Sequence, residues 1–524
     1  MTETAVRPAH FTVWDLLRTG RRIASDEGAA AKPAVICEEA RLTFAELEER
    51  ASRLASALAA RGFTRGERAA VLLHNRIEYL EIFFALARLG GVIVPVNFLF
   101  KSEEVHRQLQ DCGARWLFVQ RSLYAGSVEP FRLHLGNTPL AVVSLDDEIP
   151  DSLRYADLIA SGEPEGVDVT VDESDLFVLQ YTSGTTGRPK GAMHTHATVL
   201  ANSQQQLGDF GITSADKYLS VPALCWAAGF HMLTLATLWA GGTVVLHPSG
   251  KLDASALVCA LERTRATMVV LVPSVLRLFL EQPIEHADLS ALRRVHSGAE
   301  PVRVHLLQEL LRRLPDIELI QVYGLTEHPV CLTYLEPRFA ESKIGSSGRP
   351  SRIVDLKIVD ADGGELPRGE PGEIVHRSPA LVVGYHNRPE ETAHAFRGGY
   401  YHTGDRGYLD DEGFLHVQGR IKDMIISGGL NVYPAEVERI IEAHPAIAEA
   451  AVVGAPDERF GEVGRAHIVL RDGIQVTEEE LAEHVRRDLA DYKVPRRWVT
   501  HDEPLPRTAS GKLQKFKLTT PTPS

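Results

Sequence analysis

Helix and strand signals alternate along the first third of the chain, and this alternation constrains the fold more than any other feature. An amphipathic helix is predicted behind Thr43, whose side chain can form a capping box with Glu46. The apolar face of this helix recurs at steps of three and four residues, at Phe44, Leu47, Ala51, Leu54 and Leu58. Strands are then predicted at 69–73, 92–95 and 115–119, and helices at 77–89 and 103–112. This order is typical of parallel sheets that are covered by helices on both faces.

The rest of the chain changes character twice. Strand candidates continue the pattern through the middle, at 176–181, 268–272 and 292–296. From about Asp355 to Val383, Asp-Gly and Pro-Gly turns break up short strands, and a hairpin follows at 408–417. Behind Arg420 the pattern indicates helices at 434–443 and 478–489 and strands at 448–453 and 467–470. We therefore expect an α/β fold: a large N-terminal domain over 1–420, with helix-covered β-sheets and a small barrel-like β region, and a small α+β C-terminal domain over 421–524.

Composition excludes several classes of protein. The 524 residues carry a formal net charge of −14, which argues against a nucleic-acid-binding protein. None of the cysteines (Cys37, Cys112, Cys225, Cys259 and Cys331) lies in a CxxC pair, so no zinc motif is offered and a reducing cytoplasm is expected. No uninterrupted apolar run reaches about 18 residues, so no membrane-spanning segment is expected.

The sharpest local signal is the stretch from Tyr181 to Gly191, which reads Tyr-Thr-Ser-Gly-Thr-Thr-Gly-Arg-Pro-Lys-Gly directly behind a strand candidate. Its glycines let backbone N–H groups approach an anion, its hydroxyl groups add donors, and Lys190 adds a positive charge. The spacing of Gly184, Gly187 and Lys190 does not match a Walker A loop. The sequence therefore predicts a polyphosphate site outside the commonest nucleotide-binding fold.

This loop resembles the signature loop of the adenylate-forming superfamily, which includes acyl-CoA synthetases, peptide-synthetase adenylation domains and beetle luciferases. Further motifs occur in the family's order along nearly the whole chain. The resemblance implies an acid–thiol ligase that uses ATP and Mg²⁺ to convert a carboxylic acid to an acyl-adenylate and then passes the acyl group to coenzyme A. It assigns the phosphates to Thr182, Ser183, Gly184, Thr185, Thr186, Gly187 and Lys190.

Two segments resemble the family's adenine and metal motifs. In the stretch Gln321–Glu327, the resemblance makes Tyr323 with Gly324 the adenine platform, Thr326 a phosphate contact and Glu327 a Mg²⁺ ligand. Thr182 is expected to be a second metal ligand. The turn behind the strand at 292–296 is similar to the adenine-side loop, which implies that Gly298, Ala299 and Glu300 flank the base.

The remaining motifs fall toward the C-terminal end. By resemblance, Asp405 binds ribose with Arg420 as its companion, and Lys422 marks an interdomain hinge about which a mobile C-terminal domain rotates. Gly428 and Gly429 belong to a loop that admits the pantetheine arm, although Leu430 replaces the acidic residue of many relatives. Lys512 resembles the family's lysine that bridges the substrate carboxylate and the α-phosphate.

The acyl pocket gives the weakest signal. The stretch Val221–His231 lies where relatives carry an aromatic-rich segment, so Cys225, Trp226, Phe230 and His231 are its candidate lining residues. Trp226 and Phe230 are equally compatible with a plain core. Cys225 stands where many relatives have histidine, and because no base is evident beside it we interpret it as packing. An aliphatic or aromatic, largely apolar acid is expected.

Three other activities remain open at this stage. A stand-alone adenylation protein would load the phosphopantetheine of a carrier protein instead of free coenzyme A. A luciferase-like oxygenase would use the same adenylate. The third is a variant with one working half-reaction, for example thioesterification of a supplied acyl-adenylate; Lys512, Glu327 and the phosphate loop argue against a loss of adenylation, and Leu430 and Cys225 are the positions that bear on it.

Overall fold

The structure is a computed structural model that describes residues 10–134, 140–146, 149–182, 189–299, 304–329, 331–428, 430–471, 473–507 and 513–519. The chain divides into two compact units. Unit 1 comprises 1–344, 350–354 and 377–396, and unit 2 comprises 345–349, 355–376 and 397–524. None of the helices within these described ranges is long and apolar enough to cross a membrane.

One sheet of unit 1 has seven strands in the order β7-β6-β5-β3-β4-β8-β9. They are β3 Arg68–Leu72, β4 Val92–Pro95, β5 Trp116–Val119, β6 Ala141–Ser144, β7 Leu153–Arg154, β8 Leu176–Thr182 and β9 Lys190–Thr195. All neighbours pair in parallel except β8 and β9, which form an antiparallel hairpin at the edge. The predicted parallel arrangement of the first strands is thereby confirmed.

A second sheet of unit 1 includes the strand order β15-β14-β13-β12-β10-β11-β1-β2. These strands are β1 Pro33–Cys37, β2 Ala40–Thr43, β10 Lys217–Ser220, β11 Thr243–Leu246, β12 Met268–Val270, β13 Arg294–Gly298, β14 Glu318–Tyr323 and β15 Thr333–Leu335. The central strands β12, β13 and β14 are parallel, so their carboxyl ends meet at one edge of the sheet.

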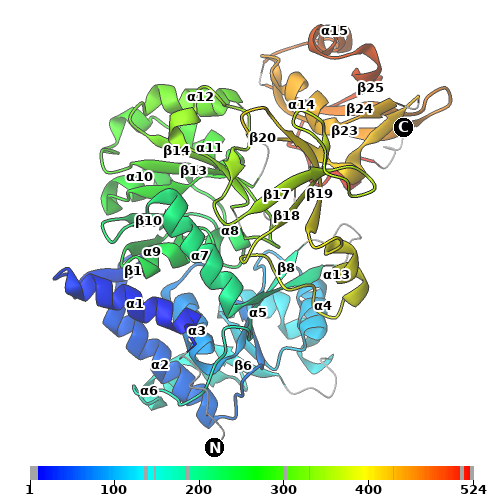
Figure 1. Cartoon of the computed structure of the whole chain (residues 1–524). Coiled ribbons are helices and arrows are strands. Elements are labelled where there is room, and N and C mark those ends of the chain that lie inside the picture. Colours follow the sequence, from blue (N-terminus) through cyan, green and yellow to red (C-terminus); the bar gives the residue numbers. More distant parts are fainter. Residues whose placement is uncertain are drawn as a thin grey trace, which may run out of the picture. The chain divides into compact units, whose positions relative to one another are not determined.

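Helices lie between and around these sheets (Figure 1). They are α1 Val13–Asp26, α2 Phe44–Ala60, α3 Ile77–Leu89, α4 Ser102–Cys112, α5 Arg121–Ser127, α6 Tyr155–Ser161, α7 His196–Phe210, α8 Ala227–Phe230, α9 Thr234–Trp239, α10 Ala254–Thr264, α11 Pro273–Leu280, α12 Val304–Arg313 and α13 Pro389–Ala395. The predicted capping box of α2 forms, because the Thr43 backbone N–H donates to Glu46 at 2.8 Å and the Glu46 N–H donates to the Thr43 hydroxyl at 3.2 Å.

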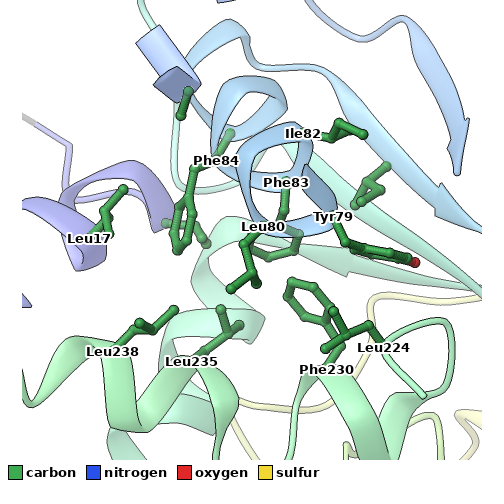
Figure 2. Close-up of a cluster of buried hydrophobic side chains, with 14 of the residues drawn as sticks. Leu17, Tyr79, Leu80, Ile82, Phe83, Phe84, Leu224, Phe230, Leu235 and Leu238 are labelled. Atoms are coloured by element: carbon green, nitrogen blue, oxygen red, sulfur yellow. The ribbon is translucent and has the colours of Figure 1, made fainter. Parts of the chain in front are cut away.

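The main hydrophobic core surrounds α3, which is buried on nearly every side. Phe83 and Phe84 of this helix face Phe230, Leu235 and Leu238 of the later helices α8 and α9 (Figure 2). A helix that is apolar all round is expected to be a central core helix. The stretch Val221–His231, here called the acyl segment, includes α8. Core residues that are far apart in the sequence therefore hold this segment against α3.

The described residues of unit 2 form two sheets. One is a four-stranded sheet of β17 Asp355–Val359, β18 Gly372–Arg377, β19 Tyr401–Leu409 and β20 Leu415–Arg420, in that order, with β18–β19 and β19–β20 antiparallel. The other contains β21 Ile425–Ser427, β22 Leu430–Val432, β23 Ile447–Asp457, β24 Gly461–Leu470 and β25 Arg497–His501, with helices α14 Pro434–Glu442 and α15 Glu478–Asp488. The α/β fold class is confirmed. The two sheets share one compact unit, and a domain boundary near Arg420 stays a prediction.

Candidate active site

The predicted phosphate loop connects the two strands of an edge hairpin. Strand β8 ends at Thr182, strand β9 begins at Lys190, and these two residues are direct partners in the antiparallel register. The hairpin is anchored where the Tyr181 hydroxyl donates to a carboxylate oxygen of Asp111 at 2.6 Å. Ser183, Gly184, Thr185, Thr186 and Gly187 lie outside the described residues. Thr182 and Lys190 therefore form the base of the loop that joins them.

Glu327 and Lys190 both contact the side chain of Tyr385, a residue that the sequence did not single out. The Tyr385 hydroxyl donates to Oε1 of Glu327 at 2.7 Å, and the Lys190 ammonium lies 5.3 Å from the centroid of the same ring. Tyr385 is only 8% exposed. Nothing in its local sequence, Gly-Tyr-His-Asn, distinguished this tyrosine from an ordinary core aromatic residue. The structure thus brings the predicted metal ligand and the predicted phosphate-binding lysine to one place.

The oxygen donors in this region fit a magnesium ion that is held largely by its nucleotide. The described residues contain no group of three or more His, Cys, Asp or Glu side chains that could hold a metal by themselves. Mg²⁺ commonly binds through one or two carboxylates together with substrate phosphates and water. In such a site Glu327 would supply the carboxylate, and Thr182 would supply a hydroxyl at the base of the predicted phosphate loop.

The predicted adenine-side residues lie at the carboxyl ends of two neighbouring parallel strands. Gly298 is the register partner of Val322, so Ala299 and Tyr323 follow at the same edge of the sheet. A Cβ atom on Gly298 would stand 2.2 Å from the Val322 carbonyl oxygen. Strands β13 and β14 therefore need glycine at this position in order to pack this closely. Ala299 has a φ of +69°, a rare conformation for a residue with a side chain. Glu300 lies outside the described residues, and Gly324 and Thr326 follow Tyr323 in the turn that leads to Glu327.

The predicted ribose residues belong to unit 2. Asp405 and Arg420 are cross-strand partners on β19 and β20, and the Arg420 Nε lies 2.7 Å from an Asp405 carboxylate oxygen. Lys422 is exposed in a short 3₁₀ turn, Ile421–Asp423, directly behind β20. Gly428 has a φ of +59°, and Leu430 is 50% exposed. Gly429 and Lys512 lie outside the described residues, and the roles of all these residues remain predictions.

The four candidate pocket residues differ in their surroundings. Phe230 is 2% exposed and its ring lies 4.0 Å from that of Phe83, which places it in the core (Figure 2). Trp226 is half-buried and stacks on Phe98 with ring centroids 6.2 Å apart. Burial raises the pKa of the Cys225 thiol to about 12, so no thiolate nucleophile forms there at neutral pH. The interpretation of Cys225 as packing is consistent with this environment.

His231, the fourth candidate, faces a second buried histidine. The rings of His194 on β9 and His231 behind α8 lie 5.2 Å apart, and both side chains are essentially unexposed. Among the residues that the structure describes, neither ring nitrogen of His231 has a hydrogen-bond partner, whereas His194 approaches the Thr326 backbone. Burial lowers the pKa of His231 to about 4 and, with His231 nearby, lowers the pKa of His194 well below its usual value. Both imidazoles are therefore neutral, and each can offer one donor and one acceptor.

Comparison with known proteins agrees with this geometry. Residues 24–386 match the AMP-binding enzyme family, and residues 436–512 match the AMP-binding enzyme C-terminal domain. The chain belongs to the AMP-binding enzyme family, the adenylate-forming superfamily that the motifs indicated.

Individual relatives resemble the chain over nearly its whole length. A feruloyl-CoA synthase of Amycolatopsis sp is 39% identical over 485 residues, which cover 91% of this chain and 93% of that protein. An indoleacetate–CoA ligase of Aromatoleum aromaticum is 38% identical over 486 residues, covering 92% and 94%. The crystal structure of the anthranilate CoA ligase AuaEII in complex with anthranoyl-AMP superimposes with a TM-score of 0.89 at 28% identity, covering 98% of this chain and 97% of that one.

Proposed function

We propose that this protein activates an aromatic carboxylic acid and transfers its acyl group to coenzyme A. The protein is an ATP-dependent, AMP-forming acid–thiol ligase whose cofactors are ATP, Mg²⁺ and coenzyme A. The observation that carries the reaction is the contact of Tyr385 with both Lys190 and Glu327 at the base of the phosphate loop. A positive charge, a carboxylate and a loop rich in donors are the groups that phosphoryl chemistry needs at one place.

In the first half-reaction, a carboxylate oxygen of the acid attacks the α-phosphorus of ATP, and the bond to pyrophosphate breaks. A carboxylate is a weak nucleophile, so the protein contributes positioning and electrostatic stabilisation. Lys190 and the loop donors bind the departing phosphates, while Lys512 bridges the carboxylate and the α-phosphate. A Mg²⁺ ion held by Glu327 and Thr182 neutralises part of the phosphate charge when it is bound.

In the second half-reaction, the thiol attacks the acyl carbonyl, the acyl–oxygen bond breaks and AMP leaves with that oxygen. Unit 2 carries the residues proposed for this step. Rotation about Lys422 withdraws Lys512 and presents the loop around Gly428 and Gly429 to the acyl-adenylate. Such hinges are short stretches at the ends of elements, which fits the exposed turn Ile421–Asp423.

The acid is proposed to be aromatic because the named substrates of three relatives are aromatic acids. The thiol is proposed to be coenzyme A rather than the phosphopantetheine of a carrier protein, since the names of the same three relatives are those of CoA ligases. A cytoplasmic location is also proposed, supported by five cysteines that are all free.

The test is acid-dependent exchange of labelled pyrophosphate into ATP across a panel of aromatic, long-chain and short-chain acids. We expect exchange with aromatic acids, followed by AMP release once coenzyme A is added. Lys512→Ala should abolish exchange but retain thioester formation from a supplied acyl-adenylate. Exchange only with long-chain acids would contradict the aromatic assignment. Competition between coenzyme A and a carrier protein with its phosphopantetheine arm identifies the thiol, and preference for the carrier protein would contradict that part of the proposal.

A further inference from the structure

The segment 382–388, here called the strap, joins the phosphate-loop hairpin to the turn that carries Glu327. The strap runs antiparallel to β9: Tyr385 is the bridge partner of Ala192, Met193 N–H donates to the Gly384 carbonyl at 2.9 Å, and His386 N–H donates to the Gly191 carbonyl at 2.8 Å. At its start, Val382 N–H donates to the Glu327 carbonyl at 2.9 Å. Backbone hydrogen bonds thus fix the hairpin and the turn to one short piece of chain.

Side chains fix the other end of the strap to the strand that enters the loop. Arg388 lies 2.9 Å from one carboxylate oxygen of Asp111, and the Tyr181 hydroxyl donates to the other at 2.6 Å. The Tyr385 backbone N–H also donates to the Thr392 hydroxyl at 3.0 Å, which ties the strap to α13. The Tyr385 ring is therefore held on a rigid support rather than on a free loop.

Tyr385 uses different parts of its side chain for two opposite charges. Its hydroxyl donates to Glu327, while its ring face lies beneath the Lys190 ammonium. A hydrogen bond to a carboxylate fixes the direction of that carboxylate, and a ring face attracts a cation without neutralising it. Within the described residues, lysine ion pairs form at Lys357, Lys493 and Lys515 but not between Lys190 and Glu327. Direct pairing would occupy the groups that are proposed to bind phosphate and metal.

We propose that Tyr385 is a positioning residue for adenylation: it orients Glu327 toward the metal and keeps Lys190 available to the nucleotide phosphates. This inference rests on the proposed function of both charged residues. It predicts two separable effects. Loss of the hydroxyl should weaken metal use through Glu327, and loss of the ring should additionally let Lys190 pair with Glu327 and weaken nucleotide binding.

The experiment measures ATP binding by calorimetry at a series of Mg²⁺ concentrations, with acid-dependent pyrophosphate exchange as a second readout. For Tyr385→Phe we expect the Mg²⁺ concentration at half-saturation to rise about tenfold in both readouts, with Mg²⁺-free ATP affinity unchanged. For Tyr385→Leu we expect Mg²⁺-free ATP affinity to fall as well. Adding Glu327→Gln to Tyr385→Leu should restore that affinity, because Lys190 then has no carboxylate to pair with.

Tyr400→Phe is the matched control. The Tyr400 hydroxyl donates to an Asp355 carboxylate oxygen at 2.8 Å, and Lys357 lies 5.3 Å from its ring centroid, so the same three groups occur at a position outside the motifs. We expect its Mg²⁺ requirement to equal that of the wild type. A wild-type requirement in Tyr385→Phe, or an equal rise in Tyr400→Phe, would overturn the inference while leaving the proposed function intact. Absence of Mg²⁺-dependent ATP binding and exchange in the wild-type protein would overturn both.

Discussion

Replacing Phe83 by alanine tests the core that supports the acyl segment. Phe83 is 1% exposed, and its ring centroid lies 4.0 Å from that of Phe230, 4.7 Å from that of Phe177 and 5.4 Å from that of Phe84. Figure 2 shows Phe83 between Phe84 and Phe230 in this core. Truncating a buried phenylalanine to alanine costs about 3–5 kcal/mol. Each aromatic neighbour contributes about 0.5–1.5 kcal/mol beyond its buried area. Three such neighbours place Phe83 at the upper end of the truncation range, so we expect Phe83→Ala to lower the free energy of unfolding by about 5 kcal/mol.

Urea denaturation followed by tryptophan fluorescence measures this loss, since Trp14, Trp116, Trp226 and Trp239 all lie in unit 1. We expect a lower midpoint with an unchanged slope, because the exposed surface of the unfolded chain hardly changes. Phe516→Ala is the control: this side chain is 66% exposed, and its loss should change stability by less than about 0.5 kcal/mol. A loss below about 1 kcal/mol for Phe83→Ala would refute the closed core around α3.

Three further predictions concern charge, thiol reactivity and substrate choice. A hydrogen bond from Arg313 lowers the pKa of the exposed Glu285 carboxyl to about 2. The ionised carboxylate therefore stabilises the fold above the unfolded-state pKa of 4.5, and this stabilisation is lost as the pH falls through about 2. The melting-temperature deficit of Glu285→Gln should shrink when the pH is lowered from about 6 to about 3. Iodoacetamide should label the exposed Cys259 of the native protein well before the buried Cys225, because the high pKa of Cys225 suppresses its thiolate. Equal labelling of the two cysteines by mass spectrometry would contradict the burial of Cys225. If His231 lines the acyl site, His231→Leu should reduce kcat/KM for a hydroxylated aromatic acid relative to its methyl analogue by about tenfold or more; an unchanged ratio would show that His231 is only a core residue.

Elements with strong local signals were predictable from the sequence. The helix expected at 77–89 is observed at Ile77–Leu89, because the apolar run is long and Gly90 ends it with a φ of +64°. The helix behind Thr43 begins where its capping box forms. By contrast, the strands expected at 448–453 and 467–470 extend to Ile447–Asp457 and Gly461–Leu470. Their pairing along a long hairpin overrides the weak strand propensity of Gly454 and Pro456.

The chemistry of the site was more predictable than its geometry. Loop composition indicated Lys190 and the hydroxyl donors beside it, and the family resemblance indicated Thr182 as a metal ligand and Glu327; the roles of these residues stay predictions. Tyr385 was not recognisable, because it is 58 residues from Glu327 in the sequence and because it contacts Lys190 only through the face of its ring. The contact between the rings of His194 and His231 was also not predictable, because nothing in the sequence indicates that two isolated histidines in apolar segments lie side by side.

The central claim is that the acid is activated through its own carboxylate oxygen, and an isotope measurement tests this most directly. The acid that supports pyrophosphate exchange is prepared with oxygen-18 in its carboxylate and turned over with ATP and coenzyme A. If an acyl-adenylate forms and the thiol then breaks the acyl–oxygen bond, one labelled oxygen must appear in the phosphate of AMP. Mass spectrometry that finds unlabelled AMP, or label in inorganic phosphate together with ADP, would contradict adenylation as the chemistry of this site.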